Sequence, residues 1–147
     1  WSGSQMRSTV LGSGSTPTSP AGNTLLAALP ADLRAIMKPC TKYSDNTGGG
    51  ADTASYVTAT TEYLFLLSKF EYDGSAGGSN NSAEKTFQAQ YPYYKAGNSH
   101  DKTDSSVNAW TRSVYLMETT NFVISVTGGF SYGSAYFSFA LAPGFCA

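Results

Sequence analysis

Apolar residues recur at helical spacing in the first quarter of the chain. Residues 4–11 are expected to form two helical turns, with Ser4 as the N-cap and Gly12 ending them. A stronger pattern follows, in which apolar side chains stand three or four positions apart: Leu25, Leu26, Leu29, Leu33, Ile36 and Met37. Because Pro30 interrupts this pattern, we predict a short helix and then a second one over residues 31–38. Their apolar face is expected to pack on a sheet.

The pattern after these helices is typical of strands. Extended structure is predicted in three segments: residues 41–43, 54–60 and 63–67. The last segment is a continuous apolar run, as in a central strand covered on both faces. From residue 110 onward the chain is again strand-like, with a β-branched run at 122–126 and a turn at 128–129. Residues 136–141 alternate as a further strand does.

Loops rich in Gly, Ser and Asn are predicted to separate these segments, at residues 12–22, 44–50, 71–82 and 96–107. Residues 84–94 are expected to be helical at first and then broken by Pro92. The aromatic group at residues 90–94 is interpreted as a plug at the edge of the core, with a sugar-binding platform as the alternative.

Composition indicates a single domain with little charge. The chain has 147 residues, of which 41% are hydrophobic, so it is long enough to bury a core. Only 13% are charged, about half the usual share, and the polar character comes from Ser, Thr, Asn and 15 Gly. This mixture, with ten Tyr and eight Phe, favours an extracellular or virion surface protein over a cytosolic enzyme.

Charge and hydropathy argue against two classes of partner. The net charge is −1 and the basic residues are scattered, so no nucleic-acid interface is expected. No apolar run approaches the ~20 residues that span a bilayer, so membrane insertion is not expected either. The chain starts Trp-Ser-Gly without an initiator Met, and we interpret residues 1–147 as one domain from the C-terminal part of a longer polypeptide.

Candidate catalytic and metal sites have weak support. Residues 129–133 read G-x-S-x-G, but a nucleophile elbow needs a helix after the serine and a histidine later in the chain. Two other groups lack the ligands or spacing of a metal site and are interpreted as solvated loops: His100, Asp101 and Asp104, and Asp45, Asn46 and Asp52. Cys40 and Cys146 are interpreted as small buried hydrophobes, with a disulfide as the alternative. We therefore expect no enzyme activity, no cofactor and no metal.

Seven short segments, spread in order over nearly the whole chain, carry a resemblance to a known family. They are Trp1 with residues 4–7, and residues 25–34, 41–43, 63–68, 90–99, 110–113 and 142–146. On these segments the chain resembles the C-type-lectin-like domains of unknown function from gut Firmicutes and their phages. Several of those domains are variable proteins of diversity-generating retroelements.

The resemblance implies an α+β, C-type-lectin-like fold, with two helices packed on a twisted, mainly antiparallel sheet and with long irregular loops. Family members vary residues between a Trp-x-Arg-Ser element and a C-terminal Gly-Phe element. Carried over by position, this implies an exposed ligand-binding face made of Thr111, Val114, Tyr115, Met117, Ser131, Tyr132, Gly133, Tyr136 and Phe137. The scaffold positions that it implies are Trp110, Arg112, Ser113, Phe122, Gly128, Pro143 and Phe145.

The sequence departs from the family pattern at a few of these positions. Val114 stands where a proline is common, and Phe137 and Phe139 are bulkier than usual. Aromatic anchors among small neighbours are typical of binding loops, which favours a face adapted to one ligand. The alternative is that Tyr132, Tyr136 and Phe139 belong to the core.

Three functions follow from the resemblance. The first is a non-enzymatic binding module on a phage virion or cell surface, which recognises a host-surface protein or glycan through the C-terminal hairpin face. The second is a structural decoration or fibre-tip domain that packs against other virion proteins, with a homo-oligomer such as a trimer formed through the parent protein. The third is an enzyme of the formylglycine-generating type, which shares this fold and needs two cysteines in one cleft; only Cys40 and Cys146 are available.

Overall fold

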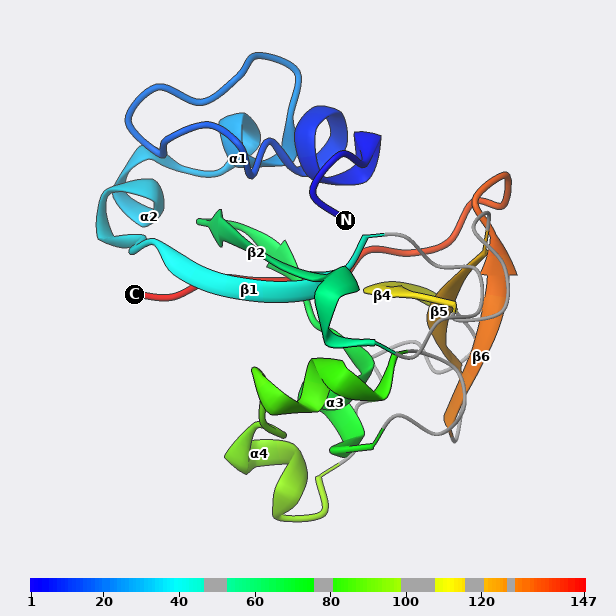
Figure 1. Ribbon diagram of the computed structural model, residues 1–147. Helices are drawn as coiled ribbons and strands as arrows, with labels where there is room; N and C mark the ends of the chain where they lie inside the picture. Colours follow the sequence, from blue (N-terminus) through cyan, green and yellow to red (C-terminus); the bar gives the residue numbers. More distant parts are fainter. Residues whose placement is uncertain (47–52, 76–80, 99–107, 116–120, 127–128) are drawn as a thin grey trace.

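The computed structural model describes residues 1–46, 53–75, 81–98, 108–115, 121–126 and 129–147 (Figure 1). The helices in these ranges are short. They are the π-helical segment η1 (Met6–Leu11), α1 (Leu25–Ala28), α2 (Ala31–Ile36), the 3₁₀ segment η2 (Ala54–Tyr56), α3 (Lys69–Asp73), the 3₁₀ segment η3 (Ser82–Thr86) and α4 (Pro92–Lys95). None of the helices described is long and apolar enough to cross a membrane.

The strands of the described residues form three small antiparallel sheets. They are β1 (Cys40–Asp45), β2 (Val57–Glu62), β3 (Phe65–Leu66), β4 (Ala109–Val114), β5 (Asn121–Val126), β6 (Gly129–Ser134) and β7 (Pro143–Gly144). The sheets pair β1 with β2, β3 with β7, and β4 with β5 and β6. In Figure 1, η1, α1 and α2 lie on one side of the β1–β2 pair, and α3 and α4 lie on the other. The fold is therefore α+β, as expected.

The helices before the first strand lie where the apolar spacing predicted them. The Ser4 hydroxyl accepts a hydrogen bond from the backbone N–H of Arg7, and Gly12 ends the segment at a φ of 76°. This left-handed backbone favours glycine because glycine has no Cβ. Thr24 caps α1, because its hydroxyl accepts a hydrogen bond from the N–H of Ala27.

The predicted loop at residues 71–82 is wrong at its start, where the chain forms α3. The Ser68 hydroxyl accepts from the N–H of Glu71, and the Glu71 carboxylate accepts from the N–H of Ser68. This reciprocal capping box starts the helix, and Gly74 ends it in a left-handed conformation. The Ser-x-x-Glu spacing was a signal for this helix that the composition of the following residues obscured.

Two predicted strands are shorter than expected. The apolar run 63–67 is buried at Leu64 and Leu66, but only its middle, β3, pairs with another strand, the two-residue β7. The alternating run 136–141 makes one parallel bridge, between Ala109 and Ala140. Alternation alone cannot create a strand where no partner lies alongside. β1 is longer than predicted, and it includes Asp45, which is fully buried rather than part of a solvated loop.

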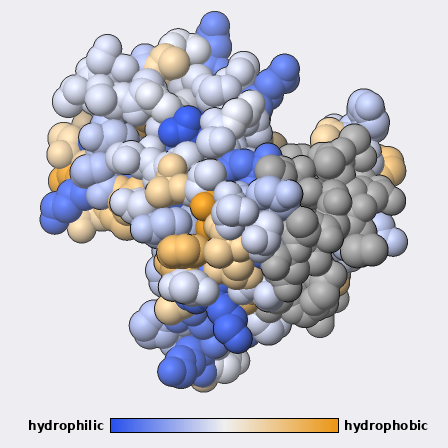
Figure 2. All heavy atoms as spheres, viewed as in Figure 1, coloured by the Kyte–Doolittle hydropathy of each residue, from blue (hydrophilic) through white to orange (hydrophobic). Residues whose placement is uncertain are grey.

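The hydrophobic core joins segments that are far apart in the sequence. Its buried members are Trp1, Leu11, Leu26, Met37, Leu64, Leu66 and Trp110. They come from the N-terminal helical region, the β3 segment and β4, so the core lies between the N-terminal helices and the strands. α2 contributes no buried residue, and Ile36 is 54% exposed, so the apolar stripe of the second predicted helix is only partly used. In the view of Figure 1, the surface of the molecule is mainly polar, with a small apolar group near its centre (Figure 2).

Candidate functional site

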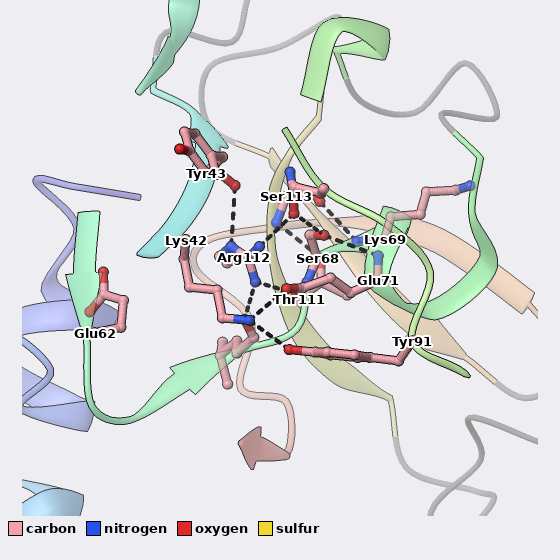
Figure 3. A network of polar contacts seen from close by, with 12 residues as sticks. Lys42, Tyr43, Glu62, Ser68, Lys69, Glu71, Tyr91, Thr111, Arg112 and Ser113 are labelled. Atoms are coloured by element: carbon pink, nitrogen blue, oxygen red, sulfur yellow. Dashed lines mark hydrogen bonds and ion pairs between the residues drawn. The ribbon is translucent and has the colours of Figure 1, made fainter. Parts of the chain in front are cut away.

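Arg112 is the centre of a buried polar network behind β4. Its side chain is inaccessible to solvent. The guanidinium donates to the Glu71 carboxylate at 2.5 Å, to the Gln88 side-chain oxygen at 2.5 Å, and to two backbone carbonyls, those of Leu66 and Tyr43 (Figure 3). Five donors in a planar fork suit this multiple contact. Arg112 thereby connects β4 to β1, to β3 and to α3.

Lys42 completes the network from β1. Its ammonium group donates to Glu71 at 2.7 Å and to the Tyr91 hydroxyl at 2.6 Å, and it lies 3.9 Å from the centre of the Phe65 ring. Burial by itself would lower the pKa of Lys42, but the Glu71 carboxylate outweighs it and the pKa is raised. The cation is therefore held in its charged form.

Glu71 is the shared acceptor of both cations. Burial by itself would raise the pKa of Glu71, but Arg112 and then Lys42 outweigh it, and the pKa is lowered. One carboxylate oxygen accepts from Lys42, and the other accepts from Arg112 and from the N–H of Ser68. Three bonds to this carboxylate, whose side chain is only 7% exposed, leave it poorly accessible to a substrate. We interpret the Arg112 network (Arg112, Glu71, Lys42, Gln88, Tyr91 and Ser68) as a structural frame.

The frame also fixes the backbone of β4. The N–H of Arg112 donates to the carbonyl of Leu67 at 3.1 Å, and the N–H of Lys69 donates to the Ser113 hydroxyl at 3.0 Å. β4 is therefore attached to the start of α3 by main-chain and side-chain bonds. The hairpin β5–β6 pairs onto this fixed strand along β5.

Exposed aromatic side chains lie on and beyond β6. Tyr132 is 54% exposed, Tyr136 is 91% exposed and Phe137 is 60% exposed. The ring of Tyr115 stacks on Tyr132, with 4.3 Å between ring centres and 18° between planes. Ser131 is also exposed. We call Tyr115, Ser131, Tyr132, Tyr136 and Phe137 the aromatic face.

An apolar cavity of about 450 Å³ adjoins the aromatic face. It lies between the N-terminal segment and the chain around β4 and β6. Its lining residues are Trp1, Ser4, Gln5, Met6, Val10, Trp110, Thr111, Ala135 and Phe137. Phe137 therefore belongs to both the face and the cavity wall. The lining includes no ionisable side chain, and its polar side chains are those of Ser4, Gln5 and Thr111, which suits an uncharged, largely apolar group.

The structure separates the predicted binding residues into two groups. Those that make up the aromatic face are Tyr115 and Tyr132, which stack on each other, and the exposed residues Ser131, Tyr136 and Phe137. Three others are buried, which corrects the expectation that they are exposed: Thr111, Val114 and Gly133. Thr111 and Val114 are buried because β4 lies against β3 and α3 and is covered there, whereas Gly133 lies on β6. Met117 lies outside the described residues.

The expected scaffold residues are also divided. Trp110, Arg112 and Ser113 are buried, as the resemblance implies. Phe145 is 40% exposed and Pro143 is also exposed, although Pro143 lies in β7 and pairs with Leu66 of β3. The side chain of Phe122, and Gly128, lie outside the described residues.

The sequence left open whether Phe139 belongs to the exposed face or to the core, and the structure places it between the two. It is partly buried and packs on Trp110, with 4.9 Å between ring centres. Tyr132 and Tyr136 are exposed, so the alternative that they belong to the core is wrong. The aromatic group at residues 90–94 is divided in the same way: the Tyr91 hydroxyl accepts a hydrogen bond from Lys42 in the Arg112 network, whereas Tyr93 is 62% exposed.

The structure brings forward residues that sequence reasoning did not assign to a site. Trp1, Met6 and Val10 line the cavity. The one available signal was the helical spacing predicted over residues 4–11, which include Met6 and Val10. The partnership of Lys42 and Glu71 had no local signal, because the two residues are 29 positions apart.

The weaker chemical candidates gain no support. Ser131 of the G-x-S-x-G run lies within β6, and a turn rather than a helix follows. His100, Asp101, Asp104 and Asp52 lie outside the described residues. Within the ranges that the structure describes, no three His, Cys, Asp or Glu side chains are grouped to hold a metal ion. Cys40 and Cys146 are free thiols.

One family model matches the chain. It is that of a domain of unknown function, DUF6273, and the match covers residues 14–146. A search of curated proteins found no match, and neither did a search of solved structures.

Proposed function

The chain belongs to the DUF6273 family of domains of unknown function, and we propose that it is a non-enzymatic binding module that recognises its partner through the aromatic face. The observation that carries this proposal is the group of exposed aromatic side chains beside an apolar cavity. Large aromatic side chains that remain exposed together are a mark of interaction surfaces.

The Arg112 network supports this proposal because a binding surface needs a rigid base. Side chains presented by a fixed element lose less conformational entropy on binding than side chains on a mobile loop. Arg112 holds β4 to α3 and β1, and β4 carries the β5–β6 hairpin. Tyr115 and Tyr132 already stack on each other, so their rings are oriented before a partner arrives.

The resemblance to C-type-lectin-like domains supplies the setting of the proposal. In that setting the module is displayed on a phage virion or cell surface, and its partner is a host-surface protein or glycan. The α+β architecture with antiparallel sheets is compatible with a C-type-lectin-like fold, which we propose as the finer classification. The low charge of the aromatic face and cavity favours an uncharged contact over an ionic one.

A structural role in a phage particle is the second candidate. The exposed aromatic side chains that suit a host ligand also suit packing against neighbouring subunits, where large apolar surface becomes buried. Burial of Tyr136 and Phe137 by sister subunits in an assembled particle would favour this second function and contradict the first.

Binding of the labelled protein to intact gut Firmicutes cells tests the proposal. Tyr136→Ala should reduce binding at least tenfold, because a central aromatic anchor typically contributes that much. Tyr93→Ala is the matched control, since Tyr93 is also an exposed tyrosine but lies on α4, outside the aromatic face. Equal binding by wild type, Tyr136→Ala and Tyr93→Ala would contradict a role for the face.

A further inference from the structure

The last residues of the chain return to the start of the first strand. The N–H of Lys38 donates to the carbonyl of Cys146 at 2.8 Å, and the two residues form an antiparallel bridge. Cys40, which opens β1, is two residues beyond Lys38. In an antiparallel pair, residues offset by two positions are diagonal neighbours on the same face. Figure 1 shows the C-terminal segment passing along β1 to the chain end.

This arrangement brings the two cysteine side chains together. The Cys40 thiol donates to the carbonyl of Glu62 at 3.4 Å, and the Cys146 thiol lies near enough to contribute to the raised pKa of Cys40. Both residues are partly exposed, so a small reagent has access to them. The two free thiols lie on segments that a backbone hydrogen bond already joins, so a disulfide would not require these segments to be brought together first.

We propose that Cys40 and Cys146 are a disulfide-forming pair that locks the C-terminal segment onto β1. The oxidant is a low-molecular-weight disulfide, such as oxidised glutathione. One cysteine thiolate attacks the small disulfide, forms a mixed disulfide and releases one small thiol. The second cysteine, after losing its proton, attacks the protein sulfur of that mixed disulfide and releases the second small thiol. Two protein thiols are oxidised and one small disulfide is reduced to two thiols.

The surroundings of Cys40 set the conditions for this reaction. Burial and then the neighbouring Cys146 thiol raise the pKa of Cys40 to about 12. Because the thiolate is the attacking species, oxidation should be slow at neutral pH and faster in mildly alkaline solution. A slow pair of this kind remains reduced during brief exposure and becomes oxidised on long exposure.

The disulfide would join Cys40 to Cys146 and so close a loop that contains most of the chain. Constraint of so long a loop restricts the unfolded chain strongly, so the oxidised form is the more stable one. The segment that becomes fixed includes β7 and leads back to Phe137 on the cavity wall. This inference does not depend on the proposed binding function, although an extracellular setting would preserve the bond.

Treatment of the purified full chain with oxidised glutathione at pH 8.5 tests the proposal. The intact mass should fall by about 2 Da, and a non-reducing peptide map should contain one Cys40–Cys146 cross-linked peptide. The Tm should rise by about 5 °C or more and return to its starting value after reduction. The control is Cys146→Ser, a change at the second-last residue, which should have the Tm of the reduced wild type. This variant should show neither the mass loss nor the rise in Tm on oxidation.

The peptide map also identifies the outcomes that contradict the proposal. Glutathione attached to either cysteine as the final product, or a disulfide between two copies of the chain, would overturn it. An intramolecular bond that leaves the Tm unchanged would overturn the locking role. Because the cell-binding assay is separate, failure of one proposal is distinguishable from failure of the other.

Discussion

The Arg112 guanidinium lies 2.5 Å from the Glu71 carboxylate, although the two residues are 41 positions apart in the chain. Their side chains are 0% and 7% exposed. An ion pair removed from water in this way is expensive to break, because the remaining charge has no solvent to stabilise it. The pair therefore determines how β4, which leads to the aromatic face, lies against α3.

Arg112→Met should lower the free energy of unfolding by about 3–5 kcal/mol, since it leaves Glu71 buried with only Lys42 as its charged partner. Urea unfolding measures the loss. Lys95→Met is the control, because Lys95 is an exposed cation on α4 and its replacement should change stability by about 0.5 kcal/mol or less. A loss below about 1 kcal/mol for Arg112→Met would contradict a central role for the Arg112 network.

Stability should fall in acid because of Glu71. Burial opposes its ionisation, but Arg112 and Lys42 outweigh burial and hold its pKa below the usual 4.5. A carboxylate with a lower pKa in the folded state contributes stability above its unfolded pKa and loses it as the pH falls through its folded pKa. Urea unfolding from pH 7 to pH 3 should therefore show a steeper loss below about pH 5 for wild type than for Glu71→Gln. Parallel pH profiles for the two proteins would assign the acid sensitivity to other groups.

Two positions of the predicted helical apolar stripe should respond very differently to truncation. Leu26 is inaccessible and belongs to the core, whereas Ile36 is 54% exposed. Leu26→Ala should cost about 2–5 kcal/mol, through lost burial and the cavity left behind. Ile36→Ala should cost under about 1 kcal/mol, because Ile36 already contacts water. Thermal and urea unfolding of both variants measure the difference, and similar losses would show that α2 packs more tightly than its exposure indicates.

The cavity should take up a small uncharged apolar molecule. Toluene is a suitable probe, because the lining side chains are mainly apolar and none is ionisable. Val10→Trp should weaken toluene binding at least tenfold, since Val10 lines the cavity and is 40% exposed, which leaves room for a larger side chain to cover it. Thr9→Trp changes the neighbouring exposed residue, which does not line the cavity, and is the control. NMR titration measures both, and equal affinities for the two variants would place the toluene elsewhere.

Local features of the fold were predictable because they depend on near neighbours. The spacing of Leu25 and Leu26 with the later apolar residues, divided at Pro30, predicted α1 and α2 near their actual places. A strand at residues 41–43 was predicted and lies within β1. The capping box of Ser68 and Glu71 was equally local, but the glycine- and serine-rich residues that follow led to the prediction of a loop.

Exposure of the aromatic residues was not predictable in the same way. Phe137 and Phe139 are two positions apart, on the same face of a segment that alternates, yet Phe137 is 60% exposed while Phe139 packs on Trp110. The resemblance implied that Thr111 is exposed, whereas β4 is covered and Thr111 is buried. Burial depends on which distant element lies opposite a side chain, and a strand-like pattern does not identify that element.

The resemblance implied the α+β class, and the sequence by itself determined the early helices and the strand-like C-terminal third. These follow from hydrogen bonds and side-chain periods that span a few residues. Only the tertiary structure decided that Glu71 meets Arg112, that Trp1 and Trp110 line one cavity, and that Cys40 lies beside Cys146. Each of these contacts joins residues that are distant in the sequence. Each is stabilised by burial, which exists only after the intervening chain has folded.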